Sequence, residues 1–531
     1  MMSIKRITGL CRVSMIALLV LGSFSATGRS QSLVEAVKNQ DQAAAAALIE
    51  QGSDVNEAEG DGTTALIWAV HGSDVEIADL LIGSGADVNL ANDYGHTALV
   101  QACSNGNSIL AQKLLDAGAN PNAAVWTGET VLMTCSRTGA ADGVQALLQH
   151  GADVHATEQE RGQTALMWAA AQGHADVIRV LLEHGADLQA RSRTVELYEP
   201  LIAVTYSKNV YLPEVKGGFT PLMFAAQSGD LESVQVLVEA GANVNDATPD
   251  DGSALVLAAT NGHEEVGLYL LEEGADPNAA DGYGITALHW TMQRGIAFLY
   301  SRPSRTDRFW NHRNSTELAK ELLVRGADPN ARIMKDFLPW DIHRYARTLG
   351  NELPQADFAG ATPFLLAAAS GDADTMRFML EAKANPGITT LEGLTPLMVA
   401  AGVGRERNAA TDEERKGYLE ALQLALDLGG DVNAKGPGGR AAVHGATILG
   451  ETEVLQVLAE HGADLEATDQ YGQTPMSIAL GDPGQYSYKP LPGGETDRRF
   501  RELAPLQEVA EFLLELGAAP YTGPVADRSG Q

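Results

Sequence analysis

The chain has 531 residues, a formal net charge of −32 and 45% apolar residues. Its 69 Asp and Glu outnumber 37 Lys and Arg, which argues against nucleic acid and anionic lipid as partners, because both attract positive charge. A basic protein is the favoured partner on the same ground. Only three cysteines occur, with no spacing typical of a zinc site, and we expect no metal and no cofactor.

Residues 1–30 have the three-part pattern of a secretory signal peptide: basic residues, an apolar run at 13–24 and then small residues. The run is shorter than the ~20 residues that span a bilayer. We therefore expect cleavage between Ser25 and Ser30, with no stable membrane anchor afterwards. The mature chain would be periplasmic or secreted, and its Ala-rich, cysteine-poor composition favours a bacterial source.

A period of 33 residues organises the rest of the chain. The phrase Gly-Ala-Asp, or a near relative, recurs first at gaps of 33, 33, 33 and 34 residues and later at one period plus an insertion. About twelve copies are recognisable, and they begin at Gly52, Gly85, Gly118, Gly151, Gly185, Gly241, Gly274, Gly326, Lys383, Gly429, Gly462 and Gly517. A fixed period of this size predicts a solenoid rather than separate globular domains.

A second phrase, Thr followed by Ala or Pro and then Leu, keeps step with the first, as at Thr164 and Thr220. Thr is a preferred helix N-cap and Pro is tolerated in the first turn, so a short helix begins after each Thr. A second, one-sided apolar helix follows, as in residues 173–183, and Gly185 ends it in the left-handed conformation. Such a unit can bury its apolar side only against a neighbouring unit.

Two stretches closely resemble ankyrin repeats: GQTALMWAAAQGHADVIRVLLEHGAD (residues 162–187) and GFTPLMFAA (residues 218–226). The resemblance implies an all-α fold with short hairpin loops, an ankyrin-repeat α-solenoid over residues 31–520, followed by a loose tail at 521–531. It also implies that histidines such as His289 bridge neighbouring loops. Five insertions interrupt the repeats, near residues 191–217, 296–316, 333–358, 404–417 and 481–504.

The sequence contains no catalytic or phosphate-binding motif, which favours a non-catalytic protein-binding scaffold that uses its loop tips and its concave face. The alternative is an enzyme whose site is assembled from the insertions. There, an Arg-rich segment that includes His312 would hold an anionic substrate. A structural protein of the cell envelope is a third interpretation.

Aromatic residues recur at two repeat-equivalent places. One lies four residues after the capping Thr, on the first helix, where a large side chain either lines the concave face or packs between helices. The other precedes the loop glycine, at the exposed tip of a finger-like loop. The candidate protein-binding residues, with four from the Arg-rich insertion, are Trp68, Tyr94, Trp126, Trp168, Phe224, Tyr283, Trp290, Arg302, Arg305, Arg308, Trp310 and Tyr471. Polar residues such as Gln172, Gln227 and Gln293 are expected along the concave edge.

Cys103 and Cys135 stand at nearly equivalent places in adjacent repeats. Stacked helices lie ~8–10 Å apart, whereas a disulfide needs Cα atoms within ~7 Å. On this comparison we expect two buried free thiols.

Overall fold

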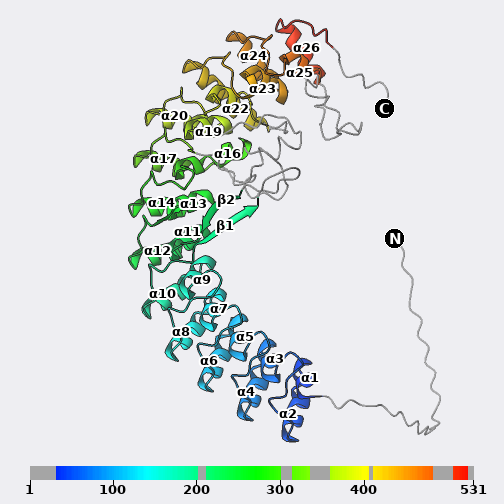
Figure 1. Ribbon diagram of the computed structural model, residues 1–531, viewed down its shortest axis with the longest axis vertical. Helices are drawn as coiled ribbons and strands as arrows, with labels where there is room; N and C mark the ends of the chain where they lie inside the picture. Colours follow the sequence, from blue (N-terminus) through cyan, green and yellow to red (C-terminus); the bar gives the residue numbers. More distant parts are fainter. Residues whose placement is uncertain are drawn as a thin grey trace, which may run out of the picture.

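The computed structural model describes residues 32–200, 211–299, 314–334, 359–405, 411–481 and 506–523. Figure 1 shows a curved stack of helix pairs in which the first helix of each pair lines the inner side of the curve and the second lies outside. The predicted all-α solenoid is therefore confirmed.

The helices and strands have the following bounds. The first helices are α1 (Leu33–Lys38), α3 (Ala65–His71), α5 (Ala98–Ser104), α7 (Val131–Thr138), α9 (Ala165–Gln172), α11 (Pro221–Ser228), α13 (Ala254–Thr260), α15 (Ala287–Thr291) with α16 (Gln293–Leu299), α19 (Pro363–Ser370), α21 (Pro396–Ala400), α23 (Ala442–Leu449) and α25 (Pro475–Ala479). The second helices are α2 (Gln42–Glu50), α4 (Val75–Gly83), α6 (Ser108–Asp116), α8 (Ala141–Gln149), α10 (Ala175–Glu183), α12 (Leu231–Glu239), α14 (Glu264–Glu272), α17 (Thr316–Val324), α20 (Ala373–Glu381), α22 (Asp412–Asp427), α24 (Thr452–Glu460) and α26 (Gln507–Glu515). Two antiparallel pairs of strands interrupt the helices in the described part of the chain: β1 (Val195–Pro200) with β2 (Tyr211–Lys216), and β3 (Ala247–Thr248) with β4 (Gly252–Ser253).

The capping residues act as the sequence predicts. The Thr164 hydroxyl accepts the Met167 N–H at 3.4 Å, at the start of α9. Gly185, just after α10, has φ 83°. Lys383 takes the same left-handed conformation with φ 70°, which costs a residue with a Cβ roughly 1–2 kcal/mol. Repeat geometry therefore prevails over local preference where glycine is missing.

The hydrophobic core is continuous along the stack. One cluster of buried apolar side chains extends from Leu33 in the first helix to Ala518 after the last. A small second cluster of Phe219, Met223 and Leu257 lies beside it, between α11 and α13. Each pair of helices thus covers the apolar side of the next, as the repeat pattern requires.

Asparagine side chains join successive repeats, a feature that the repeat pattern alone does not reveal. Asn122 accepts the Asp153 N–H at 2.7 Å and donates to the Gly151 carbonyl at 3.0 Å, both one repeat further on. The residues that make both bonds are Asn89, Asn122, Asn245, Asn278, Asn330 and Asn433. His155 and Gln189 stand at the equivalent positions, and within the described residues neither side chain makes these bonds.

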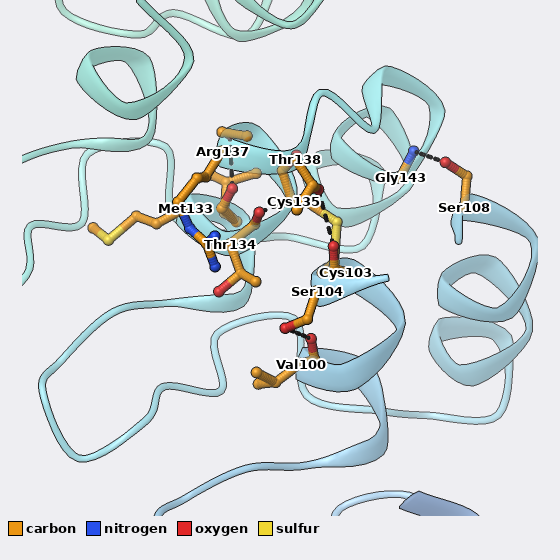
Figure 2. The surroundings of a disulfide bond; sticks show 12 residues. Val100, Cys103, Ser104, Ser108, Met133, Thr134, Cys135, Arg137, Thr138 and Gly143 are labelled. Atoms are coloured by element: carbon orange, nitrogen blue, oxygen red, sulfur yellow. Dashed lines mark hydrogen bonds between the residues drawn. A yellow bond between two sulfur atoms is a disulfide. The ribbon is translucent and has the colours of Figure 1, made fainter. Parts of the chain in front are cut away.

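The expectation of free thiols is wrong, because Cys103 and Cys135 form a disulfide between α5 and α7 (Figure 2). Their Cα atoms are 4.5 Å apart. The ~8–10 Å separation applies to helix axes, and subtracting two backbone radii of ~2.3 Å leaves facing Cα atoms only ~3.4–5.4 Å apart. Gly143 of α8 leaves room for the sulfur, because a Cβ added there would lie 3.2 Å from the Cys135 sulfur.

Replacing Asn122 by alanine should lower the free energy of unfolding by about 1 kcal/mol, because a donor and an acceptor of the next repeat lose their partner and keep only water. His155→Ala is the matched control and should cost less than about 0.5 kcal/mol. Urea titration of the two variants checks this. Equal losses would show that the asparagine bonds contribute nothing specific.

The double variant Cys103→Ala/Cys135→Ala should lose roughly 2–4 kcal/mol of unfolding free energy, because the bond closes a loop with a sequence separation of 32 residues. Thiol titration of the denatured, unreduced chain provides the independent check. The signal-free chain should show no free thiol before reduction and two afterwards. Two thiols before reduction would contradict the bond.

Candidate binding surface

The loops between repeats are short hairpins that project from the stack. In the loop before α5, Asn92 accepts the backbone N–H groups of Tyr94 and His96, each at 3.0 Å. A single β-bridge between Ala91 and Thr97 closes the hairpin. These bonds hold Tyr94 at the turn through the local backbone.

Tyr94 and Trp126 lie side by side at the tips of two consecutive loops. The Trp126 N–H donates to the Tyr94 carbonyl at 3.1 Å, so one loop is bonded to the next. The side chains remain open to solvent, with Tyr94 62% and Trp126 74% exposed. Both residues are therefore placed as predicted, on fixed backbone and at the surface.

Two exposed carboxylates accompany this aromatic pair. The Asp93 N–H donates to the Asp61 carbonyl at 2.9 Å, which places Asp61 on the neighbouring tip. Hydrogen bonds from the backbone N–H and the hydroxyl of Thr63 lower the pKa of Asp61, so its carboxylate is ionised at neutral pH. We define Asp61, Asp93, Tyr94 and Trp126 as the fingertip surface.

The other two loop tyrosines are less accessible. Tyr283 and Tyr471 are half-buried, and Tyr283 packs against the hydrophobic core. The Met334 N–H donates to the Tyr283 carbonyl at 2.8 Å, and Met334 itself is 68% exposed. Sequence position alone thus overestimated the exposure of these two tyrosines.

The aromatic residues of the first helices mainly pack within the repeats. Trp290 is only 2% exposed, so its assignment as a partner contact is wrong and the packing interpretation holds. Trp68 is half-buried, and its indole N–H donates to Glu59 at 2.9 Å while Lys38 lies over the ring. Trp168 is half-buried beneath Arg137, with the guanidinium 5.8 Å from the ring centroid.

Phe224 is half-buried as well, and its ring packs against Phe219 with the centroids 5.4 Å apart.

Of the polar residues predicted along the concave edge, Gln172 and Gln227 are exposed. Gln293 is buried instead and donates to the Ala259 carbonyl at 2.7 Å, so it joins repeats rather than facing a partner.

The inner helices carry no carboxylate within the described chain after α1. From α3 to α25, the first helices contain no Asp or Glu, whereas every second helix contains at least one. The negative charge of the protein is thus concentrated on the outer helices and the loops.

The candidates Arg302, Arg305, Arg308 and Trp310 lie outside the described residues, as do His312 and most of the insertions at 296–316, 333–358 and 481–504. The insertion at 404–417 is described in part, and its second half belongs to α22, which begins after the Thr411 cap. The enzyme alternative therefore stays a prediction on this part of the chain.

Histidines bridge neighbouring repeats, as the resemblance implied. His289 accepts the Thr286 N–H at Nδ1, so Nε2 carries the proton and donates to the Ala331 carbonyl at 3.1 Å. His444 makes the same pair of bonds with Ala441 and Ala467. Burial lowers the pKa of His289 to about 4, which keeps the ring neutral and suits a structural role.

A half-buried carboxylate, Asp281, lies in the same repeat as His289. Burial raises the pKa of Asp281 to about 6, despite hydrogen bonds from the Tyr283 and Ile285 N–H groups and the Trp290 indole.

Within the described residues, no group of three or more His, Cys, Asp or Glu side chains is arranged to hold a metal ion. In the same part of the chain, no helix has the length and apolar character needed to cross a membrane.

Replacing His289 by glutamine should destabilise the chain at pH 7.5 and much less at pH 4.5. The ordinary pKa of 6.5 applies to the unfolded chain, so between pH 6.5 and about pH 4 the ring is protonated in the unfolded state and neutral in the folded state. The contribution of His289 to the free energy of unfolding is therefore lost as pH falls. Glutamine at this helix position still accepts the cap N–H but does not titrate.

The free-energy difference between wild type and His289→Gln should shrink by about 2 kcal/mol over this range, as measured by urea unfolding. The comparison with wild type cancels the contribution of Asp281, whose raised pKa acts in the opposite direction. A difference that does not change with pH would show that the ring is not held neutral.

Comparisons with known proteins agree with this architecture. The model of the family "Ankyrin repeats (3 copies)" matches residues 33–125, 110–192, 193–281 and 222–301, which together span about half of the chain. The E3 ubiquitin-protein ligase KEG of Arabidopsis thaliana is 29% identical over 50% of this chain and 14% of its own length. The p105 subunit of nuclear factor NF-kappa-B from Gallus gallus is 29% identical over 36% of this chain and 16% of its own.

The alignments thus cover less than a fifth of the length of either relative. The crystal structure of the human ASB11 ankyrin repeat domain is 26% identical and covers 46% of this chain and 97% of that one, with a TM-score of 0.37. The family match agrees with the repeat period, the Thr caps and the stacked helix pairs. The chain belongs to the ankyrin-repeat family.

Proposed function

We propose that this chain is a non-catalytic protein-binding scaffold, exported to the periplasm or the cell exterior, that contacts its partner through the fingertip surface and the concave face. The exposure of Tyr94 and Trp126 on hydrogen-bonded backbone is the observation that supports this most strongly. Rigid aromatic side chains give a large contact area and lose little conformational entropy on binding.

The disulfide favours the same two repeats. Tyr94 lies in the loop before α5 and Trp126 in the loop before α7, and the bond between Cys103 and Cys135 joins these two helices. The relative position of the two fingertips is therefore restrained covalently as well as by the backbone hydrogen bond. Preorganisation of this kind reduces the entropy lost on association.

Charge favours a basic partner at the fingertips. Asp61 and Asp93 are exposed beside the aromatic pair, and the whole chain has a formal net charge of −32. The inner helices, which lack carboxylates from α3 onward in the described chain, suit neutral polar contacts instead. A basic segment is thus expected at the loop tips, and uncharged parts of the partner along the concave helices.

Export is supported by the disulfide together with the N-terminal pattern. Disulfides persist mainly in oxidising compartments, and the reducing cytosol removes most of them. The relatives named above come from a plant and an animal, so the bacterial source rests on the leader and the composition alone.

The double variant Tyr94→Ala/Trp126→Ala should lose at least ten-fold in partner capture from the periplasmic or extracellular fraction, because truncation of central aromatic contacts typically costs about 2 kcal/mol or more. Ile109→Ala, a 64% exposed residue on the outer helix α6, is the matched control. The captured protein is then titrated against each purified variant at low and high salt. Equal affinities, or an affinity independent of salt, would reject the fingertip surface.

A further inference from the structure

The tips of the loops before α3, α5, α7, α9 and α11 are joined in series by one backbone hydrogen bond per repeat. The Asp93 N–H donates to the Asp61 carbonyl at 2.9 Å, and the Trp126 N–H donates to the Tyr94 carbonyl at 3.1 Å. We call each bonded pair of residues a junction. The third and fourth junctions follow the same rule and are Gln159 with Thr127 at 3.2 Å and Arg193 with Arg161 at 2.6 Å.

Glycine allows the tips to come this close. A Cβ added at Gly62 would lie 3.2 Å from the Asn92 Cα, and one added at Gly95 would lie 3.0 Å from the Ala124 carbonyl oxygen. With standard backbone bond lengths, one N–H···O bond keeps the two Cα atoms of a junction within about 7 Å of each other. The two side chains of each junction therefore start from neighbouring points of the surface.

The chemistry of the junctions changes along the series. The first holds two exposed carboxylates, the second two exposed aromatic rings, and the third is uncharged. The fourth holds Arg161 and Arg193, both exposed, and the Arg193 guanidinium donates to the Gln159 carbonyl at 2.6 Å. Even with the exposed Glu160 beside it, the fourth junction keeps a positive charge. The series thus changes from negative charge, through an aromatic pair, to positive charge.

The spacing of the junctions favours one conformation of an elongated ligand. Successive junctions are one repeat apart, which is ~8–10 Å for stacked helices. A polyproline II helix has three residues per turn and a rise of ~3.1 Å, so every third side chain returns to the same side after ~9.3 Å. Side chains on one face of a β-strand are ~6.6–6.8 Å apart, and in an α-helix the seventh residue returns after ~10.5 Å. Of these three conformations, polyproline II alone falls within the range.

The second junction suits this conformation chemically. Proline-rich segments dock on aromatic side chains and lose little entropy, because the polyproline II helix forms before binding. Tyr94 and Trp126 supply two such side chains, 62% and 74% exposed. A proline at the second junction brings the residue three positions away to the first junction. There, Asp61 and Asp93 favour a cationic side chain.

We propose that the four junctions bind a segment of the partner in the polyproline II conformation, with a lysine or arginine three residues from a proline. An acidic residue six positions beyond the proline reaches the fourth junction. This inference rests on the proposed function, because it gives the partner of the fingertip surface a sequence pattern. It extends that surface by the third and fourth junctions.

A second copy of this chain is the competing occupant. Lys489 and Pro492 have the same three-residue spacing, in an insertion outside the described residues. The net charge of −32 opposes association of two copies by long-range repulsion, which favours a separate partner. Self-association that is lost in Pro492→Ala, as measured by sedimentation, would identify the second copy as the occupant and overturn the proposal.

The experiment titrates labelled, end-blocked peptides of ten residues against the signal-free chain and follows fluorescence anisotropy. The reference peptide has lysine at its first position, proline at its fourth and seventh, glutamate at its tenth, and alanine elsewhere. The control peptide has the same composition, with the lysine moved to the second position. The control should bind about ten-fold more weakly, because its lysine faces away from the carboxylates when the proline is docked.

A charge exchange tests where the lysine binds. Asp93→Lys should bind the reference peptide about ten-fold more weakly and should gain affinity for the peptide with glutamate in place of lysine. Glu183→Lys makes the same change of charge at an exposed position on the outer helix α10, and it should bind the reference peptide as wild type.

Three results would overturn the inference: no binding of the reference peptide, equal binding of reference and control peptides, or equal binding by Asp93→Lys and Glu183→Lys. The proposed function fails by a different measurement. It is rejected if capture of the partner is unchanged in Tyr94→Ala/Trp126→Ala, and it survives any of the three peptide results if capture is lost in that variant.

Discussion

Each pair of helices in this chain has an apolar side that only the next pair can cover. This lateral dependence is the constraint on which the rest of the structure rests, and it explains why one buried cluster extends from Leu33 to Ala518. It also explains why deviations are absorbed locally. Lys383 accepts a left-handed backbone, and α15 stops at Thr291 and resumes as α16, because the neighbours fix the path of the chain.

Stacking also determines how polar groups are used. Adjacent repeats meet through the side chains of Asn122 and its equivalents, and through neutral histidines such as His289, all of which bond to the backbone of a neighbouring repeat. These bonds satisfy loop groups that the helices cannot reach. The loops are consequently held by hydrogen bonds without helical structure of their own.

A surface that is ordered before binding is suited to recognition without chemistry. The fingertip surface combines two exposed aromatic rings with two exposed carboxylates, and the disulfide between α5 and α7 joins the repeats that present the rings. The two-stranded arm of β1 and β2 projects from the same stack of helix pairs.

Much of this architecture follows from the amino-acid sequence, because the 33-residue period, the capping Thr residues and the helix-ending glycines are local signals that repeat. The same pattern predicts exposed loop tips, which holds for Tyr94 and Trp126 but not for the half-buried Tyr283 and Tyr471. Tertiary packing decided the rest. Trp290 and Gln293 are buried by neighbouring helices, and Cys103 meets Cys135 because facing backbones approach more closely than helix axes do. These outcomes depend on distances between repeats, which no periodic pattern within one repeat encodes.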